Sequence, residues 1–248
     1  MMSNSRTLVI IPTFNEAENL NRIMPDLLHL PVDILIVDDN SNDGTAQVAM
    51  KLNTFDNRIT VLSRPEKLGL GSAYLAGYAF ALNAGYELII QMDADGSHRV
   101  EDLHAMMSAL EPDSEIDLVI GSRWVKGGAV KNWAKNREVL SRVANRYSRF
   151  MLGLGVKDVT AGFRIYRASL LRRMNLQGIS SQGYSFQIEM TREAVSSGAH
   201  IQEIPITFIE REIGTSKMSS AIVREAMIKV TTWGFSRIVK KFTSSPSR

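Results

Sequence analysis

The chain has 248 residues, of which 44% are hydrophobic, and it contains no cysteine, which excludes disulfides and thiolate metal sites. This length predicts one main domain with at most a small extension. The formal charge is only +3, with a pI near 9.2, but Lys and Arg outnumber Asp and Glu from Arg123 onward, which favours an anionic partner for the second half.

Short apolar runs alternate with segments of helical period along the first half of the chain. The expected strands cover residues 7–11, 33–37, 59–62, 87–92 and 117–120. Helices are expected after Asn15 as a candidate N-cap, from about residue 45, over 71–84 and over 100–110. Pro25 is expected to make the first helix irregular or to split it. The alternation predicts an α/β fold, with a mostly parallel central sheet and helices on both faces.

Two pairs of acidic residues follow expected strands. Asp38 and Asp39 come after the second strand, and Asp93 and Asp95 come after the fourth. Ligands of parallel sheets bind beyond the carboxyl ends of the strands, so both pairs are expected to converge on one cleft. Four carboxylates would repel one another there without a cation, and oxygen ligands favour a hard ion such as Mg²⁺ or Mn²⁺. The alternative interpretation of both stretches is turn and cap chemistry.

Several other catalytic and nucleotide-binding motifs are absent from the sequence. Gly69, Gly71 and Gly77 lack the spacing of the dinucleotide fingerprint, and neither a phosphate-binding loop nor a Gly-x-Ser-x-Gly elbow occurs. The four histidines show no metal-binding spacing, although His98 lies close to the second acidic pair. These absences disfavour a dehydrogenase, a phosphate-loop hydrolase and a serine hydrolase.

Six stretches together resemble the family 2 inverting glycosyltransferases of the GT-A fold. They are IIPTFNEAENL, IVDDNSNDGT, MDADGSH, IGSR, AGFRIYR and EREIGTSK. GYSFQIEM at 183–190 and KNWAKNREVLSR at 131–142 are similar to the polyprenol-phosphate (dolichol-phosphate) mannose synthases within that family. The Gln-x-x-Arg-Trp signature of processive polysaccharide synthases is absent. The resemblance implies a GT-A catalytic domain over residues 1–217.

The resemblance also implies a donor site and a metal site. Asp93 and Asp95, with Ser97 as a third ligand, would bind Mg²⁺ or Mn²⁺, and this ion would neutralise charge developing on a diphosphate leaving group. Asp95, Asp93 and Arg123 are the expected catalytic residues. The implied donor-binding residues are Pro12, Phe14, Glu16, Val37, Asp39, Asp93, Ala94, Asp95, Arg211 and Lys217. The alternative for Arg211 and Lys217 is that they are exposed basic residues on a loop.

The acceptor implied by the resemblance is a polyprenyl monophosphate. Arg123, Arg137 and Ser141 match the family positions that hold its phosphate. A phosphate monoester has a second pKa of roughly 6 and is largely dianionic at neutral pH, so its attack on the sugar needs no catalytic base. Direct attack on the anomeric carbon inverts its configuration.

Two amphipathic segments suggest contact with a membrane surface. One stripe consists of Val139, Val143, Tyr147, Phe150 and Leu154, with Arg142, Arg146 and Arg149 beside it. The other consists of Ala226, Val230 and Trp233, within an expected C-terminal helical extension and tail over residues 218–248. Basic-flanked helices of this kind lie at bilayer surfaces, and the alternative is that both stripes pack on the core. With no signal peptide and no apolar run of roughly 18 residues, peripheral association with the cytoplasmic face is expected.

The sequence therefore predicts transfer of mannose from GDP-mannose to a polyprenyl phosphate, giving a β-linked product and GDP. A polyprenyl-phosphate glucose or N-acetylglucosamine transferase using a UDP-sugar is the alternative of the same fold. A non-catalytic module that binds sugar nucleotides or anionic lipids is the alternative of another class. A membrane-embedded partner subunit is a further candidate partner, and no nucleic acid is expected.

Overall fold

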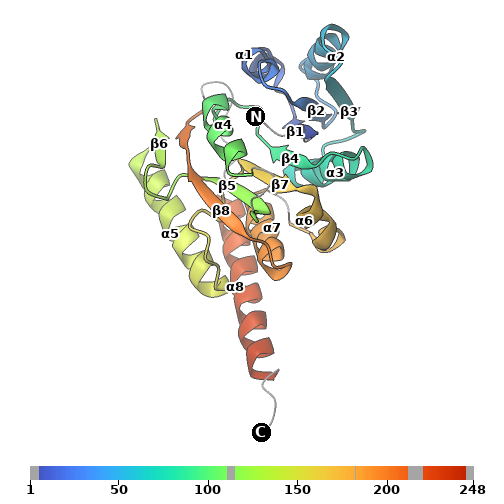
Figure 1. Ribbon diagram of the computed structural model, residues 1–248. Coiled ribbons are helices and arrows are strands. Elements are labelled where there is room, and N and C mark those ends of the chain that lie inside the picture. The colour runs from blue at the N-terminus through green and yellow to red at the C-terminus, as the bar shows by residue number, and fades with distance from the viewer. Residues whose placement is uncertain (1–5, 111–114, 182, 212–219, 244–248) are drawn as a thin grey trace.

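The structure is a computed structural model that describes residues 6–110, 115–181, 183–211 and 220–243. A seven-stranded sheet runs through its centre (Figure 1). In spatial order its strands are β3 (Ile59–Ser63), β2 (Asp33–Asp38), β1 (Thr7–Thr13), β4 (Leu88–Gln91), β7 (Arg164–Arg167), β5 (Leu118–Ser122) and β8 (Ile201–Pro205). A small second sheet pairs β6 (Ala129–Lys131) with β9 (Thr207–Ile209).

The predicted mostly parallel sheet is confirmed, with one interruption. Strands β3, β2, β1 and β4 are parallel neighbours, and β5 is parallel to β8. Strand β7 lies between β4 and β5 and is antiparallel to both. The five expected strands all form, with ends that shift by one or two residues. The antiparallel β7 was not predicted, because four residues carry too little periodic pattern to identify a strand or its neighbours.

Helices cover both faces of the sheet, as the alternation predicted. On one face lie α1 (Ala17–Leu28), α2 (Thr45–Phe55) and α4 (Val100–Ser108). On the other lie α3 (Leu70–Asn83), α5 (Lys135–Leu152), α6 (Ala168–Arg173), α7 (Tyr184–Ser196) and α8 (Ser220–Thr243), with the short 3₁₀ helix η1 (Leu176–Gly178) between α6 and α7. Successive residues of β1 face opposite clusters, with Leu8 and Ile10 in one and Val9 and Ile11 in the other. Both faces of the strand are therefore buried, which explains its continuous apolar sequence.

Two local expectations about α1 are corrected by the structure. The helix runs through Pro25 without a break. Pro25 and Asn21 are both exposed, so water can bond the Asn21 carbonyl that the proline leaves without an amide partner. Asn15 is not the N-cap. It adopts a positive φ of 58°, and its side-chain oxygen accepts a bond from the Asn42 backbone N–H at 3.1 Å.

Helices α5 and α8 lie side by side at the end of the sheet away from β3, and α8 extends beyond the rest of the fold toward the C-terminus (Figure 1). Val230 of α8 is buried in the same cluster as α3 and α7. Part of each predicted stripe is thus packed on the protein: Tyr147 bonds Thr231 across the two helices at 2.6 Å, whereas Val143 and Phe150 are exposed. The division between residues 1–217 and 218–248 stays a prediction. Within the described residues, no helix is both long enough and apolar enough to span a membrane.

Candidate active site

A cleft of about 500 Å³ opens beyond the carboxyl ends of β1, β2 and β4. This is where the sequence placed a ligand site, because the strand ends of a parallel sheet leave a crevice between their following loops. Eight of the predicted donor residues line the cleft: Pro12, Phe14, Glu16, Asp39, Asp93, Ala94, Asp95 and Arg211. Val37 does not, since its side chain is fully buried in the core of β2. Lys217 lies outside the described residues.

The wall of the cleft after β1 and β2 combines an aromatic ring with a fixed carboxylate. Lys67 lies over the ring of Phe14, with its Nζ 3.8 Å from the ring centroid. The Asp39 carboxylate accepts a bond from Arg64 Nε at 2.5 Å and another from the Gly69 backbone N–H at 3.3 Å. Asp39 is therefore held in one orientation by its neighbours, and the Phe14 ring lines the same cleft.

Asp38 does not join the other carboxylates in the cleft, which corrects the expectation that four would converge. Its side chain turns inward, where it accepts bonds from Thr13 Oγ1 at 2.9 Å and from Ser41 Oγ at 2.6 Å. Successive side chains at the end of an extended strand point to opposite sides, so only Asp39 of this pair reaches the cleft.

The acidic turn after β4 is held by a backbone hydrogen bond within the turn and by an ion pair with Arg211. Gly96, with φ at +73°, turns the chain so that the Ser97 backbone N–H bonds Asp95 Oδ1 at 3.1 Å. Asp95 Oδ2 forms an ion pair with Arg211 at 2.9 Å. Burial raises the pKa of the Asp95 carboxyl, but the Arg211 guanidinium and its other partners outweigh this and leave that pKa below its ordinary value. Asp95 is therefore ionised at neutral pH.

Asp93 is oriented by two residues that are themselves buried. The hydroxyl of Tyr74 donates to Asp93 Oδ1 at 2.7 Å, and burial together with this carboxylate raises the pKa of Tyr74 well above its ordinary value. His98 Nδ1 accepts the Asp93 backbone N–H at 3.1 Å, and burial lowers the pKa of its imidazole. A neutral His98 can act as this acceptor, which a doubly protonated ring could not.

The oxygen atoms of this turn fit a hard divalent cation that is shared with a ligand. Asp93 and Asp95 supply carboxylates, and the hydroxyl of Ser97 is buried without a hydrogen-bond partner among the described residues. In that part of the chain, no three His, Cys, Asp or Glu side chains gather into a complete metal site. Mg²⁺ and Mn²⁺ sites commonly use one or two carboxylates and take their remaining ligands from water and phosphates. The turn therefore fits such an ion together with a diphosphate.

Two of the three residues predicted to hold an acceptor phosphate lie in the same cleft as the acidic turn. Arg123 and Arg137 both line it. Arg123 forms a fork with the fully buried Asp158, through Nε and Nη2 at 2.7 Å each, and its Nη2 also donates to Thr160 Oγ1 at 2.8 Å. Arg137 forms an ion pair with Glu210. Both guanidinium groups also lie against the ring of Trp133.

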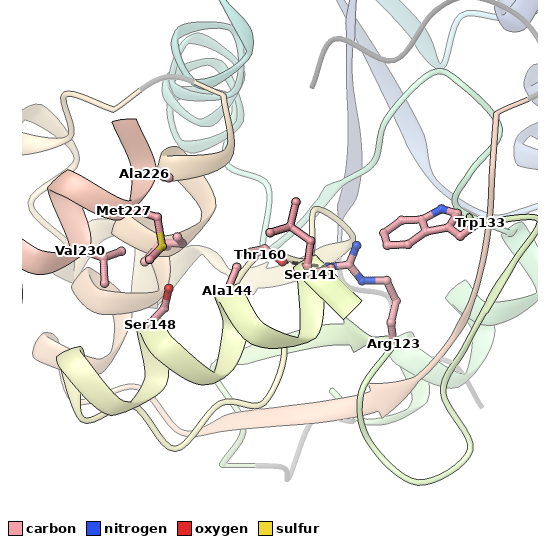
Figure 2. A pocket seen from close by; sticks show the side chains of 11 residues that line it. Arg123, Trp133, Ser141, Ala144, Ser148, Thr160, Ala226, Met227 and Val230 are labelled. Carbon is pink, nitrogen blue, oxygen red and sulfur yellow. Dashed lines mark hydrogen bonds between the residues drawn. The ribbon is translucent and has the colours of Figure 1, made fainter. Parts of the chain in front are cut away.

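Ser141, the third predicted acceptor residue, lines a separate apolar cavity of about 60 Å³ between α5 and α8. Figure 2 shows Ser141, Ala144 and Ser148 on α5 facing Ala226, Met227 and Val230 on α8, with Arg123 and Trp133 at one end. Arg123 and Thr160 line both this cavity and the large cleft. The arrangement brings an apolar slot and a charged cleft together at a guanidinium group.

Several residues of the site were not predicted from the sequence. Asp158 stands three residues before AGFRIYR, and Glu210 adjoins Arg211 in EREIGTSK. An acidic residue beside a basic motif is a signal for an ion pair, but the sequence does not reveal which of many arginines it meets. Tyr74 lies in an apolar helix and gave no signal at all. The apolar partners on α8 could not be identified before the packing of α5 against α8 was known.

Comparison with known proteins places the chain in a family. The profile of glycosyl transferase family 2 matches residues 8–174, and the chain belongs to this family. The polyprenol monophosphomannose synthase of Mycolicibacterium smegmatis is 51% identical over 232 residues, which are 92% of this chain and 87% of that protein. The undecaprenyl-phosphate mannosyltransferase of Micrococcus luteus is 47% identical over 231 residues, covering 92% of this chain and 94% of the relative. The protein is therefore a glycosyltransferase.

Solved structures confirm the GT-A type of fold. Glucosyl-3-phosphoglycerate synthase from Mycobacterium tuberculosis, in complex with Mn²⁺, UDP-glucose and phosphoglyceric acid, superposes with a TM-score of 0.68 at 16% identity, covering 93% of this chain and 80% of that one. A mannosyltransferase from Pyrobaculum calidifontis in complex with GDP-mannose and Mn²⁺ has a TM-score of 0.58 at 14% identity, covering 99% of this chain and 66% of that one. At such identities the likeness is one of fold.

Proposed function

We propose that this protein transfers mannose from GDP-mannose to a polyprenyl monophosphate, with inversion at the anomeric carbon. The observation that carries the proposal is the meeting of the charged cleft with the apolar cavity at Arg123 and Thr160. A lipid phosphate needs this combination, because its head is anionic and its tail is apolar. The names of the two relatives, which are about half identical to this chain, support the same acceptor and sugar.

The chain's own residues divide into donor and acceptor groups. On the donor side, Phe14 and Asp39 would contact the nucleoside, and Arg211, which now pairs with Asp95, would bind the diphosphate. A divalent ion, Mg²⁺ or Mn²⁺, held by Asp93 and Asp95 with Ser97 close by, would neutralise the charge of the leaving GDP. Lys217, in the same motif as Arg211, remains a proposed donor residue.

On the acceptor side, Arg123 and Arg137 would hold the phosphate, and Ser141 would lie where the tail enters its slot. A phosphate oxygen attacks the anomeric carbon, and the bond from that carbon to the GDP diphosphate breaks, so that the electron pair leaves with GDP. The phosphate is already largely dianionic at neutral pH, which means that no protein group has to remove a proton. The roles of these residues are to bind, orient and neutralise charge.

We also propose that the protein docks peripherally on the cytoplasmic face of a membrane, where such an acceptor resides. The face of α5 supports this, because Val139, Val143 and Phe150 are more than half exposed and Arg142 and Arg146 lie beside them. Exposed apolar side chains among basic ones suit an anionic headgroup boundary. A membrane-embedded partner subunit would be the alternative means of docking.

A screen of sugar nucleotides against a short polyprenyl phosphate tests the proposal directly. GDP-mannose should give a product whose mass equals the acceptor plus one hexose residue, while UDP-glucose and UDP-N-acetylglucosamine should give much less. Preference for a UDP-sugar would show that the protein transfers glucose or N-acetylglucosamine instead of mannose. Absence of turnover with every donor would favour a non-catalytic binding module.

A further inference from the structure

Glu210 and Arg211, directly after β9, cross the cleft from its basic side to its acidic side. The backbone here is tied to both sides, because the Ile209 N–H bonds the Ser97 carbonyl at 3.2 Å and the Glu210 N–H bonds the Lys131 carbonyl at 3.1 Å. Ser97 belongs to the acidic turn, and Lys131 is the last residue of β6, four residues before α5 begins. A shift of this segment would therefore change contacts with both Ser97 and Lys131.

These two adjacent residues neutralise one charge on each side of the site. Arg211 pairs with Asp95 at 2.9 Å, and Glu210 pairs with Arg137. All four side chains are less than a quarter exposed, so neither pair is strongly screened by water. Asp95 is the proposed partner of the donor's divalent ion, and Arg137 is the proposed partner of the acceptor phosphate. In each pair, a charged group proposed to bind a substrate is therefore already neutralised by a residue of the chain.

The contact with Glu210 leaves the Arg137 guanidinium incompletely satisfied. Only Nη1 of Arg137 meets the Glu210 carboxylate, whereas its Nε is buried with no hydrogen-bond partner among the described residues. The indole Nε1 of Trp133, whose ring lies 4.2 Å from the Arg137 guanidinium, is likewise buried and unbonded within the described chain. Buried donors without acceptors are costly. A phosphate has three oxygens to offer such donors, and the carboxylate present meets only part of this demand.

We propose that Glu210 is a positioning residue that stands in for the acceptor phosphate at Arg137 and withholds this arginine until the donor is bound. The inference rests on the proposed function. The donor diphosphate offers Arg211 a more highly charged partner than Asp95, and the resulting movement of Arg211 carries the adjoining Glu210 away from Arg137. The acceptor phosphate then takes the vacated guanidinium. Donor binding consequently strengthens acceptor binding, and an acceptor without a donor binds weakly.

Glu210→Gln tests this role, because it keeps the shape of the side chain and removes its charge. We expect geranyl phosphate, titrated calorimetrically without donor or metal, to bind this variant about tenfold more tightly than the wild type, since a carboxylate no longer competes with the dianion. Adding GDP with Mn²⁺ should tighten geranyl phosphate binding to the wild type and change it much less in the variant. Glu210→Asp, which retains the charge, should behave more like the wild type.

Two further variants make the result decisive. Glu138→Gln removes the same charge one residue from Arg137, on a side chain that pairs with Arg142 instead, and should leave binding unchanged. Arg137→Ala should abolish the gain in the Glu210→Gln background. If the wild type and Glu210→Gln bind geranyl phosphate equally without donor, or if Glu210→Gln keeps its tighter binding after Arg137→Ala is added, this inference is wrong while an acceptor site elsewhere can still stand. If none of the proteins binds geranyl phosphate with or without donor, the proposed function itself fails.

Discussion

Asp95 is the residue on which the proposed chemistry depends most directly. Asp95→Asn keeps the side-chain shape but removes the charge that would hold a divalent ion, so transfer should fall at least about 100-fold. The fold should remain, as judged by circular dichroism. Asp93→Asn should reduce transfer by a similar or slightly smaller factor, because its amide oxygen can still accept a hydrogen bond from the Tyr74 hydroxyl. Product formation by mass spectrometry measures both effects.

Excess EDTA should reproduce the loss seen in these variants. Adding Mn²⁺ or Mg²⁺ in excess should restore transfer, and the two restored rates would show which ion supports the reaction better. Undiminished transfer in EDTA would rule out the metal-dependent mechanism.

Asp158 contributes to stability through a buried ion pair. Its carboxylate accepts bonds from the side chain of Arg123 and from the Arg123 backbone N–H at 3.0 Å. Asp158→Asn leaves a buried guanidinium without its counter-charge, so the free energy of unfolding should drop by about 3–5 kcal/mol in urea titrations. Glu138→Gln, which breaks an exposed pair with Arg142, should cost less than about 1 kcal/mol. Equal losses in the two variants would contradict this account of Asp158.

The starts of α1 and α2 share one capping side chain. Asp43 accepts the Ala17 backbone N–H through Oδ2 at 3.1 Å and the Thr45 backbone N–H through Oδ1 at 3.0 Å. A carboxylate at two helix N-termini bonds otherwise unpaired amides and interacts favourably with both dipoles. Asp43→Ala should therefore lower the free energy of unfolding by about 1–2 kcal/mol. The exposed Asp26→Ala on α1 should change it by no more than about 0.5 kcal/mol.

The contribution of Asp43 should depend on pH in a defined direction. Slight burial raises the pKa of the Asp43 carboxyl, but its bonds with Thr45 and Ala17 outweigh this and hold that pKa below its ordinary value. A lowered pKa means that the stabilisation is complete above the unfolded value of about 3.9 and is lost as the pH falls through the folded value. The difference between the wild type and Asp43→Ala should thus shrink in acid below about pH 4. A difference that grows in acid would contradict the capping role.

At the scale of the whole molecule, the proposed peripheral docking predicts that the exposed face of α5 contacts the membrane. Truncating α8 is a poor test of docking, because Val230 belongs to the core. Phe150 is 81% exposed, so Phe150→Glu should leave the fold intact while weakening binding to anionic liposomes about tenfold, since burying a Phe side chain is worth roughly 1.5–3 kcal/mol. Sedimentation with vesicles measures this, and added salt should weaken the remaining binding.

Phe55→Glu provides the matched control for docking. Phe55 is 77% exposed on α2, which lies by the β3 end of the sheet, away from α5 (Figure 1). The Phe55→Glu variant should therefore bind liposomes as well as the wild type does. If the two variants bind liposomes equally well, α5 is not the docking face, and the role passes to the exposed side of α8 or to a partner subunit.

The α/β class, the parallel core of the sheet and the edge where the site forms could all be predicted from the sequence. These follow from local rules, because alternating apolar runs and helical segments build parallel strands, and the loops after such strands meet at one edge. The acidic turn after β4 was identified on the same grounds, whereas the roles of Arg123 and Arg137 were predicted from the family resemblance.

Which side chains meet depends on contacts between distant parts of the chain. Arg123 and Asp158 are 35 positions apart, and Arg137 and Glu210 are 73 apart, so no local pattern links them. The antiparallel β7 between β4 and β5, the inward turn of Asp38 and the cavity between α5 and α8 also depend on packing. Periodicity reports which face of an element is buried, but the partner across that face is chosen by the whole fold, because its contacts join residues far apart in the chain.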